Sequence, residues 1–578
     1  MKIASFVRDG QVDCGIVSRT GYQVFDSHPR LGAIAPERRL FDILAMSAQE
    51  RLALGAEMAG AEVVAADRVQ LLAAVPNPPL YIYDHGNAPT VWLRQMGHEL
   101  REWSGFPRVP LVRIRPATAL CGDGAEVLIP PRAKAAGGAE LGIVIGPEAY
   151  RVSRQEAAQH IAGLVVLNDM NISGLHQDFM GEGATGGGQF SGLTFAWKAA
   201  DVSAGLGPWV TTAEELKAAD AARLRPQALQ RYEDRHLASW VYDRTISTRL
   251  GGEIADQAMT NAYLWGAEDL ISYLSRFMRL ETGTVIGLAA PGWDGVWFDL
   301  PDSPGATADI AMELSEAGAM HMRLRRMQPD EEHVSPFLRS RQALGLSRQH
   351  ALESRRRSSL WVLRGNYAAW DTTEGLSQTK GIVPLLYPMR SLGTGQEPLV
   401  LPPHATTLRC AVQLAGVIGP EPVYRATPET ALSRIASVVP LLAVRDRSLA
   451  EAMPQPNTYE GRWAYFLGGC GDGFFQLGPA RPRGEVGNLN DQTMRLSAPE
   501  VGSMTWETEE YLRPLADLVV LLSRLTTLLP GDVLSLGTAG PEMEIPPSTR
   551  VETLEASCGW GVSFAVPVDD QRESASAA

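Results

Sequence analysis

Apolar residues occur along most of this chain in short runs, which are typical of β-strands rather than of long helices. Two such runs near the start flank Asp9-Gly10, a dipeptide that favours a tight hairpin turn. A helical pattern follows at 41–60. Further short runs are LYIYD (80–84), PLVRIRP (110–116), AEVLIPP (125–131) and AELGIVIG (139–146). The pattern predicts an α+β protein that is mostly β.

The stretch 139–169 predicts a strand, a turn, a helix and a second strand. Ser153 followed by Glu156 has the spacing of a capping box, which predicts a helix start, and Gly163 predicts the end of that helix. The next strand has the sequence LVVLND. Glu140 and Asp169 therefore lie at the ends of the two predicted strands.

Much of this pattern returns in the second half of the chain. VIGPE begins at Val144 and again at Val417, a shift of 273. Other short motifs recur around it in the same order: LIPP and VLPP with a shift of 272, LGP with a shift of 271, and LSR, after a deletion, with a shift of 248. The chain is therefore predicted to be an internal duplication. The second copy has Gln413 and Ala443 near the positions of the two carboxylates, so we expect it to be structural.

The boundaries follow from the repeat and from proline-rich or charged stretches. The glycine-rich segment 181–192 is predicted to be a mobile loop and a candidate lid. The expected parts are a small N-terminal domain (1–75), a first repeat (76–328), a linker (329–357), a degenerate second repeat (358–568) and a disordered tail (569–578).

Composition narrows the functional classes. The 578 residues, 45% hydrophobic and 20% charged, are those of an ordinary globular protein with several domains. A net charge of −14 argues against nucleic-acid binding, because phosphate neutralisation needs clustered Lys and Arg. The five cysteines are scattered, which favours a reducing compartment. With neither a signal peptide nor a long apolar segment in the sequence, we expect a cytoplasmic protein without a membrane partner.

Several motifs together resemble the fumarylacetoacetate hydrolase superfamily: GAELGIVIG, LND, Lys198 ahead of LGPW, and LETGTVIGLAAPG. The resemblance implies a mixed β-sandwich roll whose two tandem copies form a pseudo-dimer within the chain, with a further homodimer as an option. It also implies a divalent cation, Mg²⁺ or Mn²⁺, held by three carboxylates. The implied substrates are 2-oxo acids or β-dicarbonyl compounds that react through an enolate or carbanion.

The resemblance also assigns roles to residues. It makes Glu140 and Asp169 metal ligands, while Gly138 stands where the family has its first glutamate, so metal affinity should be reduced or lost. It makes His85 a general base and Lys198 the cation that stabilises an oxyanion. Candidate substrate contacts are Asp84, His176, Gln177 and Asp178. At the histidine and lysine positions the second copy has Trp370 and Gly469.

Each of these side chains also has a structural explanation. The two carboxylates could be paired with backbone groups or an arginine, and His85 and Lys198 could be ordinary surface residues. Three functions therefore stay open: a C–C hydrolase, decarboxylase or tautomerase with a weakened metal centre, a metal-independent cyclase or isomerase of secondary metabolism, and a non-catalytic scaffold.

Overall fold

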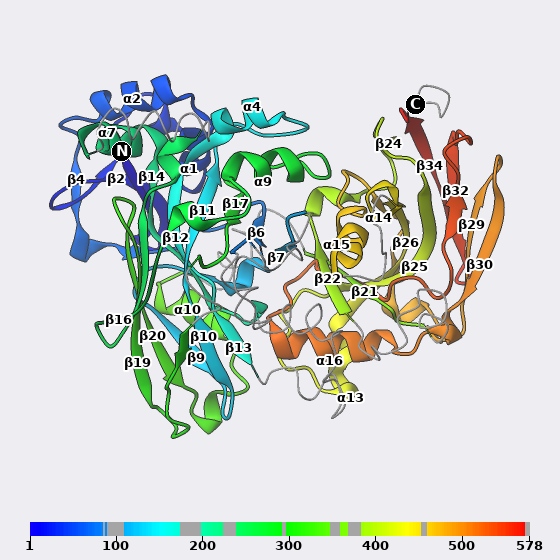
Figure 1. Cartoon of the computed structure of the whole chain (residues 1–578). Coiled ribbons are helices and arrows are strands. Elements are labelled where there is room, and N and C mark those ends of the chain that lie inside the picture. The colour runs from blue at the N-terminus through cyan, green and yellow to red at the C-terminus, as the bar shows by residue number, and fades with distance from the viewer. Residues whose placement is uncertain are drawn as a thin grey trace, which may run out of the picture. The chain divides into compact units, whose positions relative to one another are not determined.

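The computed structural model describes residues 1–84, 87–88, 109–173, 198–223, 238–291, 296–346, 359–367, 383–451 and 459–572. These residues form two compact units. The first contains the described residues up to 346, and the second contains those from 359 onward. Figure 1 labels the elements of both units.

The first unit is built on a 12-stranded sheet. Its main path has the order β4-β3-β2-β1-β14-β12-β11-β17-β6-β7, and β5 and β8 pair with β1 and β14. The strands are β1 (Lys2–Arg8), β2 (Gln11–Val17), β3 (Gly21–Val24), β4 (Val63–Ala65), β5 (Gln70–Leu71), β6 (Tyr81–Asp84), β7 (Val112–Ile114), β8 (Leu120–Cys121), β11 (Ala139–Ile145), β12 (Ile161–Asn168), β14 (Ala204–Thr212) and β17 (Val285–Gly287).

A second sheet of the first unit has the order β16-β15-β19-β20-β9. Strands β19 and β20 of this sheet contact β12 and β14 of the large one, which makes a β-sandwich. A small third sheet has the order β13-β10-β18. The strands are β9 (Ala125–Ile129), β10 (Lys134–Gly137), β13 (Asn171–Ser173), β15 (Thr245–Leu250), β16 (Glu253–Met259), β18 (Val296–Phe298), β19 (Thr307–Leu314) and β20 (Gly318–Arg326).

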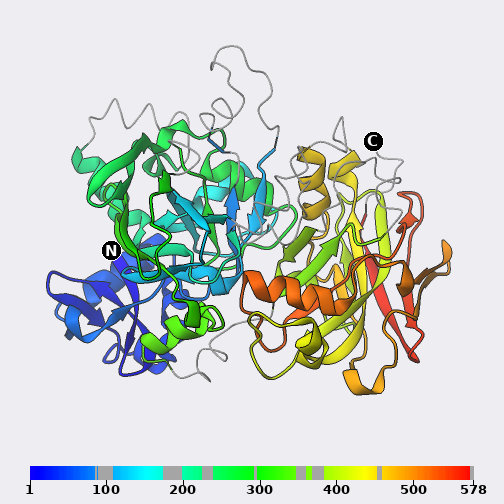
Figure 2. The ribbon, with the colours of Figure 1, turned by 90° about the horizontal axis from the view of Figure 1, so that it is seen from below.

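The N-terminal residues join the large sheet through β1, which pairs with β14. The predicted hairpin is confirmed: β1 and β2 pair, and both Asp9 and Gly10 have positive φ angles. Figure 2 shows these residues, in dark blue, grouped at one end of the first unit. The helices of the unit are α1 (Pro36–Ala45), α2 (Ala48–Glu57), α4 (Arg154–Ala157), α7 (Ala213–Arg223), α9 (Ala267–Leu274) and α10 (Pro336–Ala343).

The helix predicted after Ser153 starts where expected but is shorter. Ser153 and Glu156 form the capping box, whereas Gly163, predicted as the helix end, lies within β12. The prediction was wrong because this glycine serves strand packing. A Cβ atom on Gly163 would lie 2.3 Å from the carbonyl oxygen of Thr211 in the neighbouring strand β14.

The second unit repeats the order of the first. Its larger sheet runs β22-β21-β31-β25-β26-β27, which matches β7-β6-β17-β11-β12-β14, and β24-β34-β33-β29-β30 matches β9-β20-β19-β15-β16. This equivalence confirms the duplication and the predicted mostly-β fold. The strands are β21 (Leu360–Arg364), β22 (Val383–Tyr387), β23 (Leu392–Gly393), β24 (Leu399–Leu401), β25 (Leu408–Ile418), β26 (Ile435–Asp446), β27 (Phe475–Leu477), β28 (Arg481–Pro482), β29 (Thr493–Ala498), β30 (Gly502–Glu507), β31 (Val533–Ser535), β32 (Met543–Ile545), β33 (Thr553–Cys558) and β34 (Val562–Asp570).

The helices of the second unit are α13 (Pro428–Ala431), α14 (Ser448–Glu451), α15 (Tyr459–Leu467) and α16 (Leu515–Leu525). Its end differs from the prediction, because β34 continues to Asp570 and Arg572 is buried and ion-paired with it. The ordered chain therefore extends into the segment expected to be a disordered tail. The predicted linker likewise contains α10, which starts at its N-cap Ser335.

The structure also shows the state of the cysteines and the length of the helices. All five cysteines are buried and unpaired. None of the helices in the described part of the chain is long and apolar enough to cross a membrane.

Candidate active site

The order of the strands brings four sequence-predicted residues to one edge of the large sheet. Glu140 lies near the start of β11, and Asp169 directly follows β12, which is antiparallel to it with Ala139 opposite Asn168. Asp84 is the last residue of β6. Because β6 is parallel to β17 and β17 is antiparallel to β11, the end of β6 lies at the same edge as the start of β11. Lys198 contacts this group as well. All four side chains are buried or nearly so.

Two cations bind the carboxylate of Asp169. Arg115 contacts its Oδ1 and Lys198 contacts its Oδ2. Arg115 is also fixed by a hydrogen bond from Nη2 to the Met170 carbonyl oxygen at 2.9 Å. The Lys198 Nζ atom lies 4.8 Å from the centre of the Tyr83 ring. Asp169 is thus the anionic partner of a buried arginine and a buried lysine.

Glu140 is a buried carboxylate with one unsatisfied oxygen. Its side chain is 2% exposed, and its Oε2 atom has no hydrogen-bond partner among the described residues. Burial raises the pKa of this carboxyl to about 7, and Asp84 contributes in the same direction, against the opposing effect of Lys198 and Arg115. A carboxyl of this kind exchanges a proton near neutral pH.

In the second unit, the residue equivalent to Glu140 has hydrogen-bond partners for its side chain. The strand register places Gln413 at the position of Glu140, because Gly287 lies opposite Gly142 and Ser535 lies opposite Ala415. Gln413 is buried, accepts a hydrogen bond from the Ser535 hydroxyl at 2.7 Å and donates one to Thr538 Oγ1 at 3.2 Å.

The first unit has no equivalent of these two hydroxyls. Gly287 stands in place of Ser535 and Ala290 in place of Thr538. The hydroxyl groups that bind the Gln413 amide in the second unit are therefore missing in the first unit, which has the carboxylate of Glu140 at this position. The first copy therefore keeps at this position a buried acidic group whose Oε2 atom has no hydrogen-bond partner among the described residues.

The two cations are also confined to the first copy. The register of β21 and β22 places Tyr387 at the position of Arg115, and Gly469 corresponds to Lys198. A Cβ atom on Gly469 would lie 2.7 Å from the Tyr387 ring, so the aromatic ring occupies this space. Tyr387 packs against Phe475 with ring centroids 4.7 Å apart. In the second copy an aromatic ring thus takes the place of Arg115 and Lys198, and the buried Arg445 lies beside it.

Not all of the predicted site residues are placed by the structure. Asp84, Glu140, Asp169 and Lys198 come together as expected. Four other candidates lie outside the described residues: His85, His176, Gln177 and Asp178. Their roles stay predictions.

Arg115 was missed by the sequence reasoning. Arg113 and Arg115 alternate with apolar residues in PLVRIRP, and this period of two places both on one face of a strand. Both are buried, at 5% and 3% exposure. Charged residues on an otherwise apolar strand were the available signal, since arginine is seldom fully buried unless it is paired.

Comparison with known proteins matches this architecture. The model of the fumarylacetoacetate (FAA) hydrolase C-terminal family matches residues 82–324 and again residues 376–557. The chain belongs to this family. The two matched segments correspond to the two copies, so the duplication extends over most of this FAA hydrolase family member.

The curated relatives are distant. The human mitochondrial oxaloacetate tautomerase FAHD2B is 25% identical over 215 residues, which are 37% of this chain and 58% of the relative. The human FAHD2A protein, also named as an oxaloacetate tautomerase, is 24% identical over 271 residues, 47% of this chain and 73% of the relative. The chain thus spans little more than half the length of FAHD2B.

Among solved structures, the maleylpyruvate hydrolase of Sphingobium sp. SYK-6 aligns with a TM-score of 0.40 at 20% identity, covering 56% of this chain and all of the other. A second structure of that hydrolase is a complex with manganese(II) ion and pyruvate.

The residues of this family member do not fit a centre of three carboxylates. Both oxygens of Asp169 are bound by cations, and Gly138 supplies no side-chain ligand. Within the described ranges, no group of three His, Cys, Asp or Glu side chains is arranged to hold a metal ion. The Glu140 Oε2 atom has no hydrogen-bond partner among the described residues, but one carboxylate does not make a three-carboxylate centre. A divalent ion at Asp169 would have to displace Arg115 and Lys198.

Proposed function

We propose that the first unit catalyses proton transfer next to the carbonyl group of a 2-oxo acid or β-dicarbonyl acid, that is, a tautomerisation or isomerisation through an enolate. The observation that supports this most is the buried, unpartnered carboxylate of Glu140 beside two buried cations. The second unit, in which Gln413, Tyr387 and Gly469 replace these groups, is proposed to be structural.

Glu140 is the proposed proton acceptor. In the forward step its carboxylate takes a proton from the carbon next to the carbonyl, and the C–H electron pair moves to form the carbon–carbon double bond of the enolate. Return of the proton from Glu140 to a conjugated carbon completes an isomerisation. In a tautomerisation the enolate oxygen instead takes a proton from water, and the protonated Glu140 gives its proton back to water, so no other co-reactant is consumed. Burial without a partner leaves this carboxylate poorly solvated, and its basicity is therefore high for a glutamate.

Lys198 and Arg115 are the proposed electrophilic groups. The ammonium group of Lys198 is placed to stabilise the enolate oxygen as negative charge develops on it. Arg115 uses Nη2 for Asp169 and Met170, while its Nε and Nη1 atoms have no hydrogen-bond partner in the described part of the chain. We assign the Nη1 donor to one oxygen of the substrate carboxylate, because guanidinium groups donate to carboxylates with fixed geometry. Asp169 holds both cations in position.

This arrangement favours the metal-independent version of the family's chemistry for this chain. Arg115 and Lys198 lie in the same cluster as Glu140, and we assign to them the stabilisation of the oxyanion, so the proposed step does not depend on a bound ion. Relatives named as oxaloacetate tautomerases are consistent with a proton transfer of this class. His85 keeps its predicted role as a second acid or base adjacent to Asp84.

The direct test is an absorbance assay on a panel of β-dicarbonyl and 2-oxo acids, with oxaloacetate included, using the full chain. Enol and keto forms differ in ultraviolet absorbance, so their interconversion is followed without a coupling enzyme. We expect turnover of at least one member by the wild type, loss of it in Glu140→Gln, and retention in Gln413→Ala. Equal turnover by wild type and Glu140→Gln would refute the assignment.

A further inference from the structure

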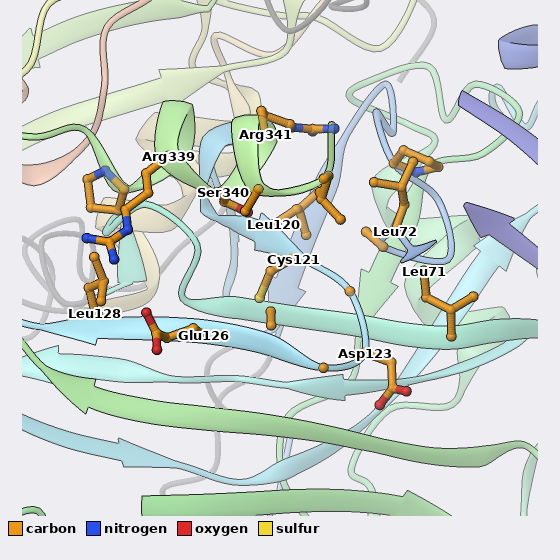
Figure 3. A pocket seen from close by; sticks show the side chains of 18 residues that line it. Leu71, Leu72, Leu120, Cys121, Asp123, Glu126, Leu128, Arg339, Ser340 and Arg341 are labelled. Atoms are coloured by element: carbon orange, nitrogen blue, oxygen red, sulfur yellow. The ribbon is translucent and has the colours of Figure 1, made fainter. Parts of the chain in front are cut away.

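A cavity away from the candidate active site lies between α10 and the strands of the first unit. Its volume is about 250 Å³. Residues Leu71 and Leu72 line one side, residues 120–126 and Leu128 line the base, and α10 covers it. Figure 3 shows Arg339, Ser340 and Arg341 of α10 above the strand that bears Glu126 and Leu128.

Three of the four charged residues that line the cavity in the described chain have partners of opposite charge or a fixed polar contact. Glu126 pairs with Arg325 at 3.0 Å, and Arg339 pairs with Glu331. Asp123 accepts the backbone N–H of His321 at 2.6 Å and lies 3.5 Å from its ring nitrogen Nδ1.

Arg341 is the fourth charged residue and differs from the other three. It is 8% exposed, and no carboxylate of the described residues pairs with its guanidinium group. Its side chain lies 5.3 Å from the centre of the Phe337 ring, one turn earlier in α10. Burial lowers the pKa of Arg341 to about 10. An unpaired buried arginine is destabilising, so its presence in a cavity calls for an anionic partner.

The direction of the side chain supports this. In Figure 3 the guanidinium of Arg341 points toward the side on which Leu72 lies, while Arg339 extends toward the side of Glu126. The two arginine side chains therefore extend in different directions. The lining of the cavity also contains apolar residues, with Leu72, Leu120 and Leu344 among them.

We propose that this cavity is a binding site for a small organic anion, a monocarboxylate with a short apolar chain, whose carboxylate pairs with Arg341. One unpaired cation matches one negative charge, which favours a monocarboxylate over a phosphate dianion. The volume corresponds to about eight water-sized groups, the number of non-hydrogen atoms in hexanoate. This site does not depend on the proposed function, since its lining residues do not include Glu140, Lys198 or Asp169.

The test is calorimetric titration of the full chain with hexanoate and with hexanamide, which has the same shape without the charge. We expect saturable binding of one hexanoate per chain and at least tenfold weaker binding of hexanamide. Arg341→Met should weaken hexanoate binding by about 10- to 100-fold, the range of a lost charged hydrogen bond. Arg339→Met is the matched control, because it lines the same cavity from the same helix, and should change binding less than threefold.

Several results of these titrations would overturn the proposal. Equal binding of hexanoate and hexanamide, retained binding in Arg341→Met, or no saturable binding at millimolar hexanoate overturns the proposal. Glu140→Gln must bind hexanoate as the wild type does, and loss of binding in that variant would place the anion in the candidate active site instead. If Arg341→Met does not fold, the comparison of hexanoate with hexanamide on the wild type still decides.

Discussion

Replacing Glu140 by glutamine tests the most unusual feature of the site, a buried carboxylate without a partner. The pKa of this carboxyl is raised from its ordinary 4.5 to about 7. Between these values the folded state binds more protons than the unfolded state. The free energy of unfolding therefore falls as the pH rises from about 4.5 to 7 and is constant above that.

The size of the effect follows from the same shift. It corresponds to about 3 kcal/mol at pH 8, since each tenfold change in proton affinity is about 1.4 kcal/mol. Glutamine at position 140 has the shape of glutamate without its charge. It loses the electrostatic attraction to Lys198 and Arg115, and it finds no hydroxyl groups like those that bind Gln413. We therefore expect Glu140→Gln to be more stable than the wild type by about 1–3 kcal/mol at pH 8, with no gain at pH 4.5.

The assay is denaturant unfolding of both proteins at the two pH values, followed by tryptophan fluorescence. Gln413→Glu is the mirror-image control: it places a carboxylate at the satisfied position, and it should lower stability at pH 8 while leaving activity unchanged. The reasoning fails if Glu140→Gln is less stable than the wild type at pH 8. It also fails if the difference between the two proteins is the same at both pH values.

Three further predictions concern the cations, the sheet packing and metal content. Lys198→Met should reduce kcat by about 10²- to 10³-fold in the absorbance assay, because one charge facing the enolate oxygen is lost, whereas a change of less than threefold would remove Lys198 from the mechanism. Gly163→Ala should cost about 1–3 kcal/mol in unfolding experiments, because its Cβ meets the Thr211 carbonyl oxygen. The control Gly55→Ala, in α2 with open space around it, should gain about 0.5–1 kcal/mol. Elemental analysis of the purified chain should find Mg²⁺ and Mn²⁺ well below one ion per chain, and a stoichiometric ion lost in Asp169→Ala would show that Arg115 and Lys198 do yield to a metal.

Local patterns predicted the elements that depend on neighbouring residues. Each of these features depends on residues that are close together in the sequence. They are the hairpin at Asp9-Gly10, the capping box at Ser153 and the short strands. The duplication was visible because the offset between the copies is nearly constant. The charged candidates at strand ends came together because antiparallel neighbours place the start of one strand beside the end of the next.

Features that depend on which residues lie opposite each other in neighbouring strands could not be predicted from sequence patterns. Gly163 looked like a helix end because only the approach of β14 explains it. Arg115 is 54 residues from Asp169, and the ion pair depends on the order of five strands in the sheet, β7, β6, β17, β11 and β12. The contrast between Glu140 and Gln413 became informative only when Ser535 and Thr538 were placed beside the glutamine.

The central claim is that Glu140 of the first unit transfers a proton at the carbon next to a 2-oxo group without a bound metal ion. Proton NMR in D₂O measures this directly as hydrogen–deuterium exchange at that carbon of a 2-oxo acid that the enzyme accepts, with the protein pretreated with EDTA. We predict that the wild type and Gln413→Ala catalyse exchange equally and that Glu140→Gln reduces it to the uncatalysed rate. Exchange that survives in Glu140→Gln, or that appears in the wild type only after Mg²⁺ or Mn²⁺ is added, would contradict the account.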